Sequence, residues 1–273
     1  MKWGREAVKN SKRIVVKVGT STLTYDNGKI NLGRIERLAR VLSDLNNQGK
    51  EVILVSSGAI GVGCSKLNLK ERPRSIREKQ AVAAVGQCEL MHIYSKLFGE
   101  YGNIVGQILL TRAVIEDPHI RKNVINTFET LLEKGIVPVV NENDTVSIDE
   151  IRNMLNFGDN DNLSAIVAKL VKADLLIILS DIDGFYDSDP RVNENSKMLK
   201  EIYEITPELE DFAGGAGTAQ GTGGMKTKLE AAKVAMGAGI AMVLTNGKDP
   251  DILRNIVQGE EIGTLFINKR GDN

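Results

Sequence analysis

A glycine-rich segment that runs into two lysines, residues 221–228, is the strongest candidate for phosphate chemistry in this chain. Glycines let backbone N–H groups approach an anion closely, and the start of a helix adds a partial positive charge. A lysine adds a full charge that phosphate oxygens can share. The segment matches neither the Walker A pattern nor the dinucleotide pattern G-x-G-x-x-G, so a surface loop before an ordinary helix remains an alternative.

Far from this segment, Lys17 lies inside the apolar run of residues 14–18. Such a lysine is costly to desolvate unless an anion faces it, although its side chain could also extend to the rim of the sheet. Gly19 and Thr20 follow directly and offer a close backbone and a hydroxyl group. The segment therefore predicts a second phosphate-facing group.

Small residues follow the next apolar run, residues 52–55, where Ser57 and Gly58 stand at a turn from strand to helix. Such a turn frees backbone N–H groups for a carboxylate or an oxyanion, and the alternative is a serine that caps the helix. Serine hydrolase chemistry is disfavoured because the pattern G-x-S-x-G is absent.

Acidic and amide residues form two further clusters, at residues 141–145 and 158–162. Their position at consecutive strand–helix junctions suggests a pocket for a positively charged group such as an α-ammonium. Asp159 and Asn160 could instead be simple helix caps. Asp181 follows another apolar run and could orient a lysine or magnesium-bound phosphates, or be a turn residue.

Predicted strands and helices, which must position these groups, alternate along the whole chain. Strands are predicted at residues 14–18, 52–55, 104–110, 137–140, 175–179 and 241–244, and helices at 32–45, 75–98, 123–132, 161–171 and 226–236. Asn31 is the expected N-cap and Gly49 the expected C′ residue of the first helix. Strands that are apolar on both faces belong in a covered, mostly parallel sheet. The prediction is an α/β fold, a three-layer sandwich of helices around one sheet, with ligands at the carboxyl ends of the strands.

Composition excludes several classes of protein. The 273 residues include 35 basic and 36 acidic ones, and this balance argues against a general binder of nucleic acid or of membrane surfaces. The two cysteines cannot build a disulfide framework. The first residues contain no apolar signal region, and the longest apolar runs have the length of strands. We expect a soluble cytoplasmic protein.

The motifs taken together resemble the glutamate 5-kinases of the amino acid kinase family. The resemblance rests on residues 16–21, 56–60, 84–87, 109–112, 141–144, 158–165 and 221–228, and it extends from about residue 12 to residue 266. It implies one amino acid kinase domain over residues 1–273, with a glutamate-binding part at about 1–170 and an ATP-binding part at about 171–273. A C-terminal domain of the PUA type, which many family members carry, is expected to be absent.

The resemblance also implies the roles of individual residues. Expected catalytic residues are Lys17, Lys228 and Asp181, and expected glutamate-binding residues are Ser57, Gly58, Asp144 and Asn160. Expected ATP-binding residues are Lys17, Gly19, Thr20, Ser180, Asp181, Thr222, Gly223, Gly224, Met225, Lys226, Thr227 and Lys228. The cofactors would be ATP and Mg²⁺, with no dedicated protein metal site because the ion is held mainly through the ATP phosphates.

The implied reaction is the ATP-dependent phosphorylation of the γ-carboxylate of L-glutamate, the first step of proline biosynthesis. Two alternatives stay open. One is another enzyme of the family, acting on N-acetylglutamate, aspartate or a nucleoside monophosphate; the other is a non-catalytic sensor of nucleotides or amino acids. The family further implies a homo-oligomer and a glutamyl phosphate reductase as a functional partner, with no nucleic-acid or membrane partner.

Overall fold

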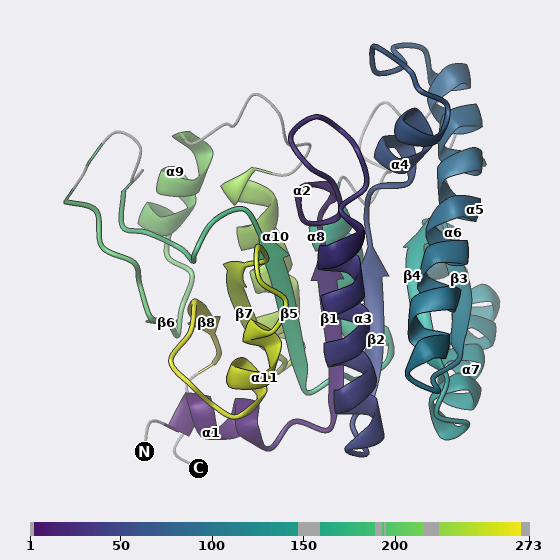
Figure 1. Ribbon diagram of the computed structural model, residues 1–273. Coiled ribbons are helices and arrows are strands. Elements are labelled where there is room, and N and C mark those ends of the chain that lie inside the picture. Colours follow the sequence, from purple (N-terminus) through teal and green to yellow (C-terminus); the bar gives the residue numbers. More distant parts are fainter. Residues whose placement is uncertain (1–2, 147–158, 189–192, 194, 216–223, 269–273) are drawn as a thin grey trace.

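A sheet of eight strands runs through the middle of the described part of the molecule (Figure 1). The computed structural model describes residues 3–146, 159–188, 193, 195–215 and 224–268. The strands are β1 (Arg13–Val18), β2 (Glu51–Ser56), β3 (Val105–Leu110), β4 (Val137–Glu142), β5 (Leu175–Ser180), β6 (Glu201–Ile202), β7 (Ala241–Asn246) and β8 (Thr264–Phe266). Their order in the sheet is β3-β4-β2-β1-β5-β7-β8-β6, and neighbours are parallel except for the antiparallel pair β7 and β8.

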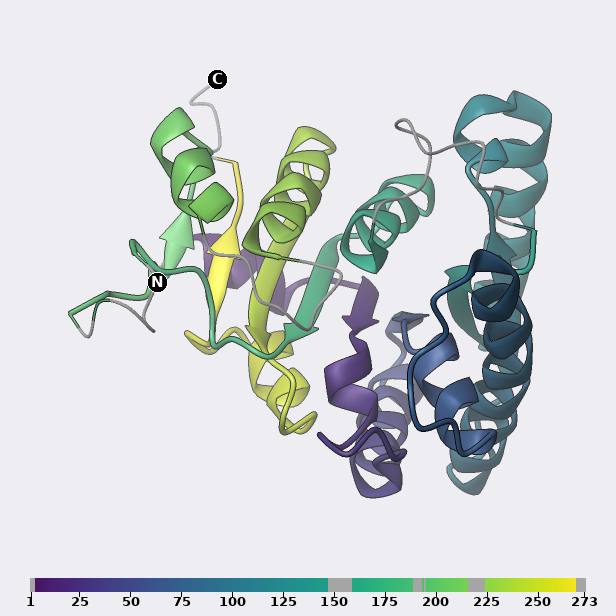
Figure 2. The same cartoon turned by 90° about the horizontal axis from the view of Figure 1, so that it is seen from above.

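Helices cover both faces of this sheet (Figure 2). They are α1 (Trp3–Lys9), α2 (Thr20–Leu23), α3 (Leu32–Asn47), α4 (Ala59–Lys66), α5 (Ile76–Glu100), α6 (Ala113–Glu116), α7 (Pro118–Glu133), α8 (Asn160–Leu170), α9 (Pro207–Gly215), α10 (Met225–Gly237) and α11 (Ile252–Val257). Alternate residues of each strand enter opposite cores: Ile14 packs with α3, α5 and α11, whereas Val15 packs with α7, α8 and α10. The predicted three-layer α/β fold is therefore confirmed.

The strand order reverses next to β1. From β1 the sheet continues to β2 on one side and to β5 on the other, with Lys17 paired in register with Val55 and with Ile178. In parallel sheets, loops leave in opposite directions at such a point and open a crevice at the carboxyl ends of the strands. The carboxyl end of β1 is therefore the place where the fold favours a ligand.

The predicted elements lie within the observed ones, apart from small shifts at their ends. Asn31 caps α3, with its side chain accepting a hydrogen bond from the N–H of Arg34 at 3.1 Å, and Gly49 follows the C-cap with φ of 85°. The helix predicted at 123–132 begins earlier, at Pro118, because Asp117 caps it and proline is suited to the first helical turn. The short helix α2 was missed, since its few small residues give no amphipathic pattern, and of α4 only the start, at the turn after Ser57 and Gly58, was expected.

The contact between α4 and α5 depends on two glycines. A Cβ atom on Gly86 would lie 1.7 Å from the carbonyl oxygen of Ala59, and one on Gly63 would lie 2.1 Å from the carbonyl oxygen of Val82. The two helix backbones therefore touch. This contact fixes the first residues of α4, which directly follow Ser57 and Gly58.

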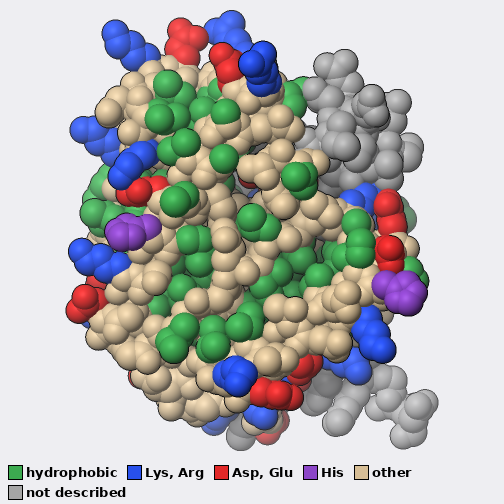
Figure 3. Space-filling model, turned by 90° about the vertical axis from the view of Figure 1, so that its right-hand side faces the viewer, with side chains coloured by type: hydrophobic (Ala, Val, Ile, Leu, Met, Phe, Trp, Pro, Cys, Tyr) green, Lys and Arg blue, Asp and Glu red, His purple; other side chains and the backbone are tan. Residues whose placement is uncertain are grey.

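The edge of the sheet at β3 forms one side of the molecule. Figure 3 shows that hydrophobic and uncharged side chains occupy the middle of this side, while charged side chains gather around its rim. Val85, Ile104 and Ile120 are among the large apolar residues that the described chain leaves exposed. Within the described residues, no helix has both the length and the apolar character needed to cross a membrane.

Candidate active site

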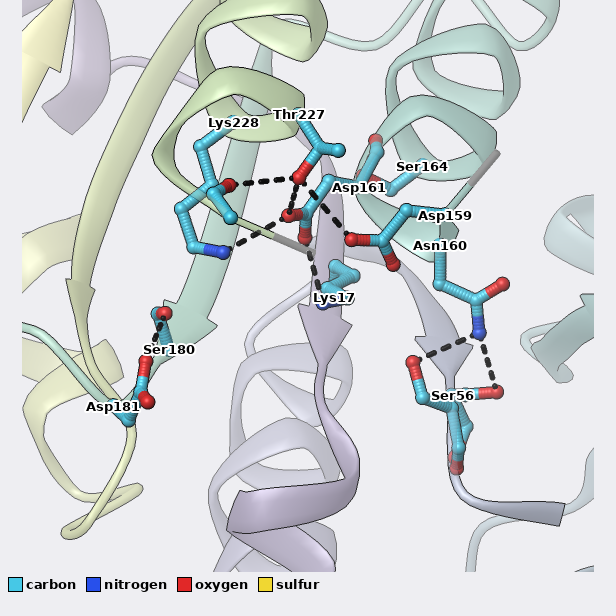
Figure 4. A network of polar contacts seen from close by, with 12 residues as sticks. Lys17, Ser56, Asp159, Asn160, Asp161, Ser164, Ser180, Asp181, Thr227 and Lys228 are labelled. Carbon is cyan, nitrogen blue, oxygen red and sulfur yellow. Dashed lines mark hydrogen bonds and ion pairs between the residues drawn. The ribbon is translucent and has the colours of Figure 1, made fainter. Parts of the chain in front are cut away.

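Two lysines from distant parts of the chain meet at one carboxylate at the carboxyl end of β1 (Figure 4). Lys17 Nζ lies 2.6 Å from Asp161 Oδ1, and Lys228 Nζ lies 3.1 Å from Asp161 Oδ2. The lysine side chains are each 7% exposed and the Asp161 side chain is fully buried. Two positive charges and one negative charge are thus held together in a site with very little solvent.

Three elements bring these groups together. Lys17 is the next-to-last residue of β1, Asp161 lies in the first turn of α8, and Lys228 lies in the first turn of α10. The helices α8 and α10 pack side by side on the same face of the sheet (Figure 2). Their N-termini point toward the carboxyl ends of the strands, so their partial positive charges add to those of the lysines.

The protonation of the two aspartates of this cluster follows from their neighbours. Burial disfavours the charged form of Asp161, but the charges of Lys17 and Lys228 outweigh it and lower the pKa of this carboxyl group. The pKa of Asp159 is raised, first by burial and then by the negative charge of Asp161. Asp161 is therefore the ionised partner of the lysines, while Asp159 gains a proton more readily.

Thr227 joins the two aspartates to the start of α10. Its Oγ1 atom lies 3.2 Å from Asp159 Oδ2, 3.2 Å from Asp161 Oδ2 and 2.9 Å from the carbonyl oxygen of Gly224. The hydroxyl group therefore fixes α10 against α8. Lys226, in the same turn of α10, is exposed and stands apart from this buried cluster.

A network of amides lies next to the lysine cluster, over β2 and β4. Asn160 donates through Nδ2 to Ser57 Oγ at 2.8 Å and to Asn141 Oδ1 at 3.0 Å. Asn141 in turn donates to Gln87 Oε1 at 2.9 Å. Asn160 thus belongs to a network of amide hydrogen bonds and is not the cap of α8, and it lies one position from Asp161.

Two carboxylates lie at the end of β4 beside this network: Glu142 is the last residue of the strand and Asp144 follows it. Burial, and to a smaller extent the nearby charge of Asp144, raises the pKa of Glu142 to about 7. Burial also raises the pKa of Asp144. Each group would gain from a cation that stayed close, because a positive charge offsets the cost of ionisation in a partly buried place. The pocket for an ammonium group therefore stays a prediction for these residues.

Glycines shape the turns around the cluster. Gly58 precedes α4 with φ of 98°, a left-handed conformation that favours glycine, and a Cβ atom there would lie 3.2 Å from Leu23 Cδ1. Gly58 is the N-cap residue of α4, so the alternative that Ser57 caps this helix is wrong. A Cβ atom on Gly19 would lie 3.6 Å from Lys17 Nζ, which places the turn before Thr20 beside the ammonium group.

Ser180 and Asp181 end β5 on the other side of the lysines. Ser180 is buried and donates through Oγ to Asp181 Oδ1 at 3.0 Å, and Asp181 is exposed (Figure 4). We expected that Asp181 could orient a lysine. In the structure Lys17 and Lys228 both pair with Asp161 instead. Thr222 and Gly223 of the predicted ATP site lie outside the described residues, and Gly224 and Met225 stand at the start of α10.

The role of Asp161 is the main feature that sequence reasoning missed. The residue lies on the buried side of α8, with Ser164, Ala165 and Ala168. A carboxylate among buried positions of a helix needs a cationic partner, and this signal could have identified it. The alternative interpretation of Asp159 was a helix cap. Asp159 does occupy the N-cap position of α8, but its side chain makes no capping hydrogen bond.

The carboxylates of the site determine how a magnesium ion could be held. No group of three or more His, Cys, Asp or Glu side chains among the described residues is arranged to hold a metal ion. Asp161 is already engaged by the two lysines, and Asp159 remains as a carboxylate that feels both lysine charges. These residues fit a magnesium ion that arrives on a triphosphate and meets one protein carboxylate.

Comparisons with known proteins identify the family of the chain. Residues 12–246 match the model of the amino acid kinase family. The chain is 70% identical over 268 residues to the glutamate 5-kinase of Clostridium perfringens, covering 98% of this chain and 100% of that protein. It is 65% identical to the glutamate 5-kinase of Listeria monocytogenes serovar 1/2a, covering 97% of this chain and 96% of that protein.

Solved structures are similar in fold. The carbamate kinase of Giardia lamblia bound to AMP-PNP superimposes with a TM-score of 0.65 at 18% identity, covering 96% of this chain and 100% of that one. The UMP kinase of Bacillus anthracis gives a TM-score of 0.64 at 20% identity, covering 95% of this chain and 97% of that one. The fold, the family model and the two close relatives together show that the chain belongs to the amino acid kinase family and, within it, to the family of the glutamate 5-kinases.

Proposed function

We propose that the protein transfers the γ-phosphoryl group of ATP to the γ-carboxylate of L-glutamate, giving L-glutamyl 5-phosphate for proline biosynthesis. The observation that carries the proposal is the meeting of Lys17 and Lys228 at Asp161, one residue from the amide network of Asn160. The choice of acceptor is supported by the relatives of 65–70% identity, which are named glutamate 5-kinase.

The chemistry suits a site without histidine. A free γ-carboxyl group has a pKa near ~4.3, so the acceptor is ionised at neutral pH and needs no general base. One of its oxygens attacks the γ-phosphorus, a new P–O bond forms, and the bond to the oxygen between the β- and γ-phosphorus breaks to release ADP. The main obstacle is the repulsion between two anions, together with the charge on the transferred group.

The two lysines address this obstacle. An ammonium group has three donors, so it can bind Asp161 and a phosphate oxygen together. Because Asp161 carries one negative charge and the lysines carry two positive ones, these three groups have a net charge of about +1 when all are ionised. A fixed positive charge in a site with little water stabilises the transferring phosphoryl group more strongly than it would in water.

The amide network and the carboxylates hold the acceptor. The Asn160 amide and the Ser57 hydroxyl provide donors for the γ-carboxylate, and the N–H groups after Gly58 add more. Asp144, with Glu142 beside it, would pair with the α-ammonium group. An acylated amine lacks that charge, which favours free glutamate over N-acetylglutamate.

The nucleotide would lie on the other side of the lysines, over Ser180, Asp181 and the start of α10. Magnesium would neutralise part of the phosphate charge and be held mainly by phosphate oxygens, with Asp159 as the protein carboxylate within reach. In this arrangement residues 1–170 supply most of the glutamate site and residues 171–273 most of the nucleotide site. Lys17, Gly19, Thr20 and Asp159 are exceptions, because they come from the first part and would face the phosphates or their magnesium ion.

Substrate choice is tested by ATP consumption with glutamate, N-acetylglutamate, aspartate and UMP as separate acceptors. Glutamate should be the preferred acceptor by a wide margin. Turnover with another acceptor and none with glutamate would favour a different kinase of the family. Binding of ATP and glutamate without any turnover, measured by calorimetry, would favour the sensor.

The role of the lysines is tested by Lys228→Ala, which should lower kcat by about 10²–10³-fold, the usual effect of removing one charge-stabilising donor. Lys233→Ala on the same helix is a matched control, because Lys233 is exposed and pairs with Glu210 at the surface. Near-normal kcat in Lys228→Ala would exclude the proposed role.

The same assignment implies a cytoplasmic enzyme that forms a homo-oligomer and passes its labile acyl phosphate to a reductase. Light scattering of the purified protein would give its subunit number. The half-life of the product with and without the reductase would test the transfer.

A further inference from the structure

The nucleotide site of the proposed kinase must extend away from the acceptor site. The amide network lies over β2 and β4, and the lysine cluster lies at the end of β1 (Figure 4). The next strands on the free side are β5 and then β7. Because neighbouring strands are about 4.8 Å apart, the ends of β5 and β7 lie roughly 5 and 10 Å from the end of β1. The nucleoside of a triphosphate bound at the lysines therefore extends over these two ends.

The ends of β5 and β7 are tied to each other and to the phosphate-facing turn. Ser180 pairs in register with Asn246, and the N–H of Gly247 donates to the carbonyl oxygen of Ser180 at 2.8 Å. A Cβ atom on Gly247 would lie 2.8 Å from Thr22 Oγ1, so the turn after β7 touches α2. These contacts form a continuous rim from Thr20 to Asn246 beside the lysines.

One carboxylate on this rim has a fixed orientation and no role in the reaction described above. Asn246 donates through Nδ2 to Asp183 Oδ1 at 2.8 Å, and its own Oδ1 accepts from the N–H of Lys248 at 2.9 Å. The second contact determines which side of the Asn246 amide faces Asp183. Asp183 is exposed, in the turn that follows β5.

The chemistry of this pair fits the sugar of a nucleotide. An ionised carboxylate only accepts hydrogen bonds, and it has two oxygens for doing so. The two vicinal hydroxyl groups of a ribose are adjacent donors whose spacing matches the two oxygens of a carboxylate. A triphosphate or a carboxylate ligand would be repelled by Asp183. The base has no comparable pair of adjacent hydroxyl donors.

We propose that Asp183, oriented by Asn246, binds the ribose hydroxyl groups of the nucleotide and makes the enzyme prefer ribonucleotides over deoxyribonucleotides. This inference rests on the proposed kinase function. Asp183 would contact the nucleotide directly, and Asn246 would act as a positioning residue.

The test is a thermodynamic cycle that removes the Asp183 carboxylate from the protein, one hydroxyl group from the nucleotide, or both. Calorimetry would compare a non-hydrolysable ATP analogue with its 2′-deoxy and 3′-deoxy forms, on the wild-type protein and on Asp183→Asn. The wild type should bind at least one deoxy form about 10- to 100-fold more weakly, the usual effect of losing a hydrogen bond to a charged group. In Asp183→Asn this difference should fall to about two- to tenfold, because the amide oxygen still accepts a hydrogen bond but carries no charge. Asn246→Ala should reduce the difference in the same direction.

Asp211→Asn is the matched control, because Asp211 is an exposed aspartate on α9. It should leave the preference for the ribonucleotide unchanged. Full preference in Asp183→Asn, or no preference in the wild type, would overturn the inference. Because binding is measured without turnover, this outcome is distinct from the failure of the kinase proposal, which would appear as an absence of glutamate-dependent ATP consumption.

Discussion

Asp161 is the residue on which the position of both lysines depends. Its replacement by Asn keeps the shape but removes the negative charge, so two nearly buried cations are left to repel each other. We expect kcat to fall by about 10²–10³-fold, because the ammonium groups move away from the transferring phosphoryl group. Breaking a buried ion pair should also lower the free energy of unfolding by about 3–5 kcal/mol.

Steady-state kinetics at saturating ATP and urea denaturation measure these two effects for Asp161→Asn. Saturating ATP should restore part of the lost stability, because the triphosphate supplies the missing negative charge. Wild-type kcat in the variant would show that the lysines keep their positions without Asp161.

Glu142 gives a prediction on pH. Its pKa is raised to about 7 by burial and by Asp144, above the ordinary value for a glutamate. The folded state therefore holds a proton that the unfolded state has lost, and Glu142 makes stability fall as the pH rises from about 4.5 to about 7. Binding of the ammonium group of glutamate requires the opposite form. We expect kcat/KM for glutamate to fall as the pH drops below about 7, since this ratio reports the free enzyme.

A pH profile of kcat/KM for glutamate, at saturating ATP, checks this prediction. Glu142→Gln should lower the ratio at high pH and flatten the decline between about pH 8 and pH 6, because the titrating group is gone. An unchanged decline in the variant would assign the titration to another group.

Much of the site could be predicted at the scale of single residues. Lys17 and Lys228 were identified because a lysine in an apolar strand and one after a glycine-rich turn both need an anion. Their meeting at Asp161 was not predicted, because it depends on the packing of α8 against α10. Ser57 and Asn160 were ambiguous in sequence, and only the structure shows that Gly58 and Asp159 occupy the two N-cap positions while Ser57 and Asn160 bond to each other.

At the scale of elements, α4 and α5 determine how firmly the acceptor loop is held. Gly86→Ala would place a Cβ atom 1.7 Å from the carbonyl oxygen of Ala59, so the helices must separate. We expect the free energy of unfolding to fall by about 1–3 kcal/mol or more, as for other overpacked contacts. The KM for glutamate should rise, because α4 starts directly after Gly58.

Gly99→Ala is the control for this prediction, since Gly99 lies in the same helix and an added Cβ would have no neighbour within 4 Å. This change should be neutral or stabilise the protein by at most about 1 kcal/mol, because alanine favours a helix over glycine. Urea denaturation and glutamate kinetics on the two variants compare them directly. Equal stability of both variants would mean that the helix contact adjusts without cost.

The elements themselves were predictable where they are long and periodic, as α3 and β1 show. Short or two-residue elements such as β6 and α2 carry too few apolar positions for a period to appear. The order of the strands also could not be derived locally. The pairing of β1 with β5 joins residues more than 150 positions apart, and it depends on the packing of the whole sheet.

At the scale of the whole molecule, the structure bears on whether the two proposed parts are independent. The glutamate-binding part (residues 1–170) and the nucleotide-binding part (residues 171–273) meet at β1 and β5, which pair over five residues in the middle of one sheet. Each core contains residues of both parts, such as Ile14 with Val243 on one face and Val15 with Leu176 on the other. A boundary drawn here would expose both cores.

We therefore expect the two parts to unfold in a single cooperative transition. Circular dichroism and calorimetry should give the same midpoint, and the calorimetric and van't Hoff enthalpies should agree. A non-hydrolysable ATP analogue at about 100 times its Kd should stabilise the whole molecule by about 2.7 kcal/mol, because it binds only the folded state. Two separate transitions, of which the analogue shifts only one, would show instead that the halves fold as independent domains and that the central β1–β5 pairing couples them only weakly.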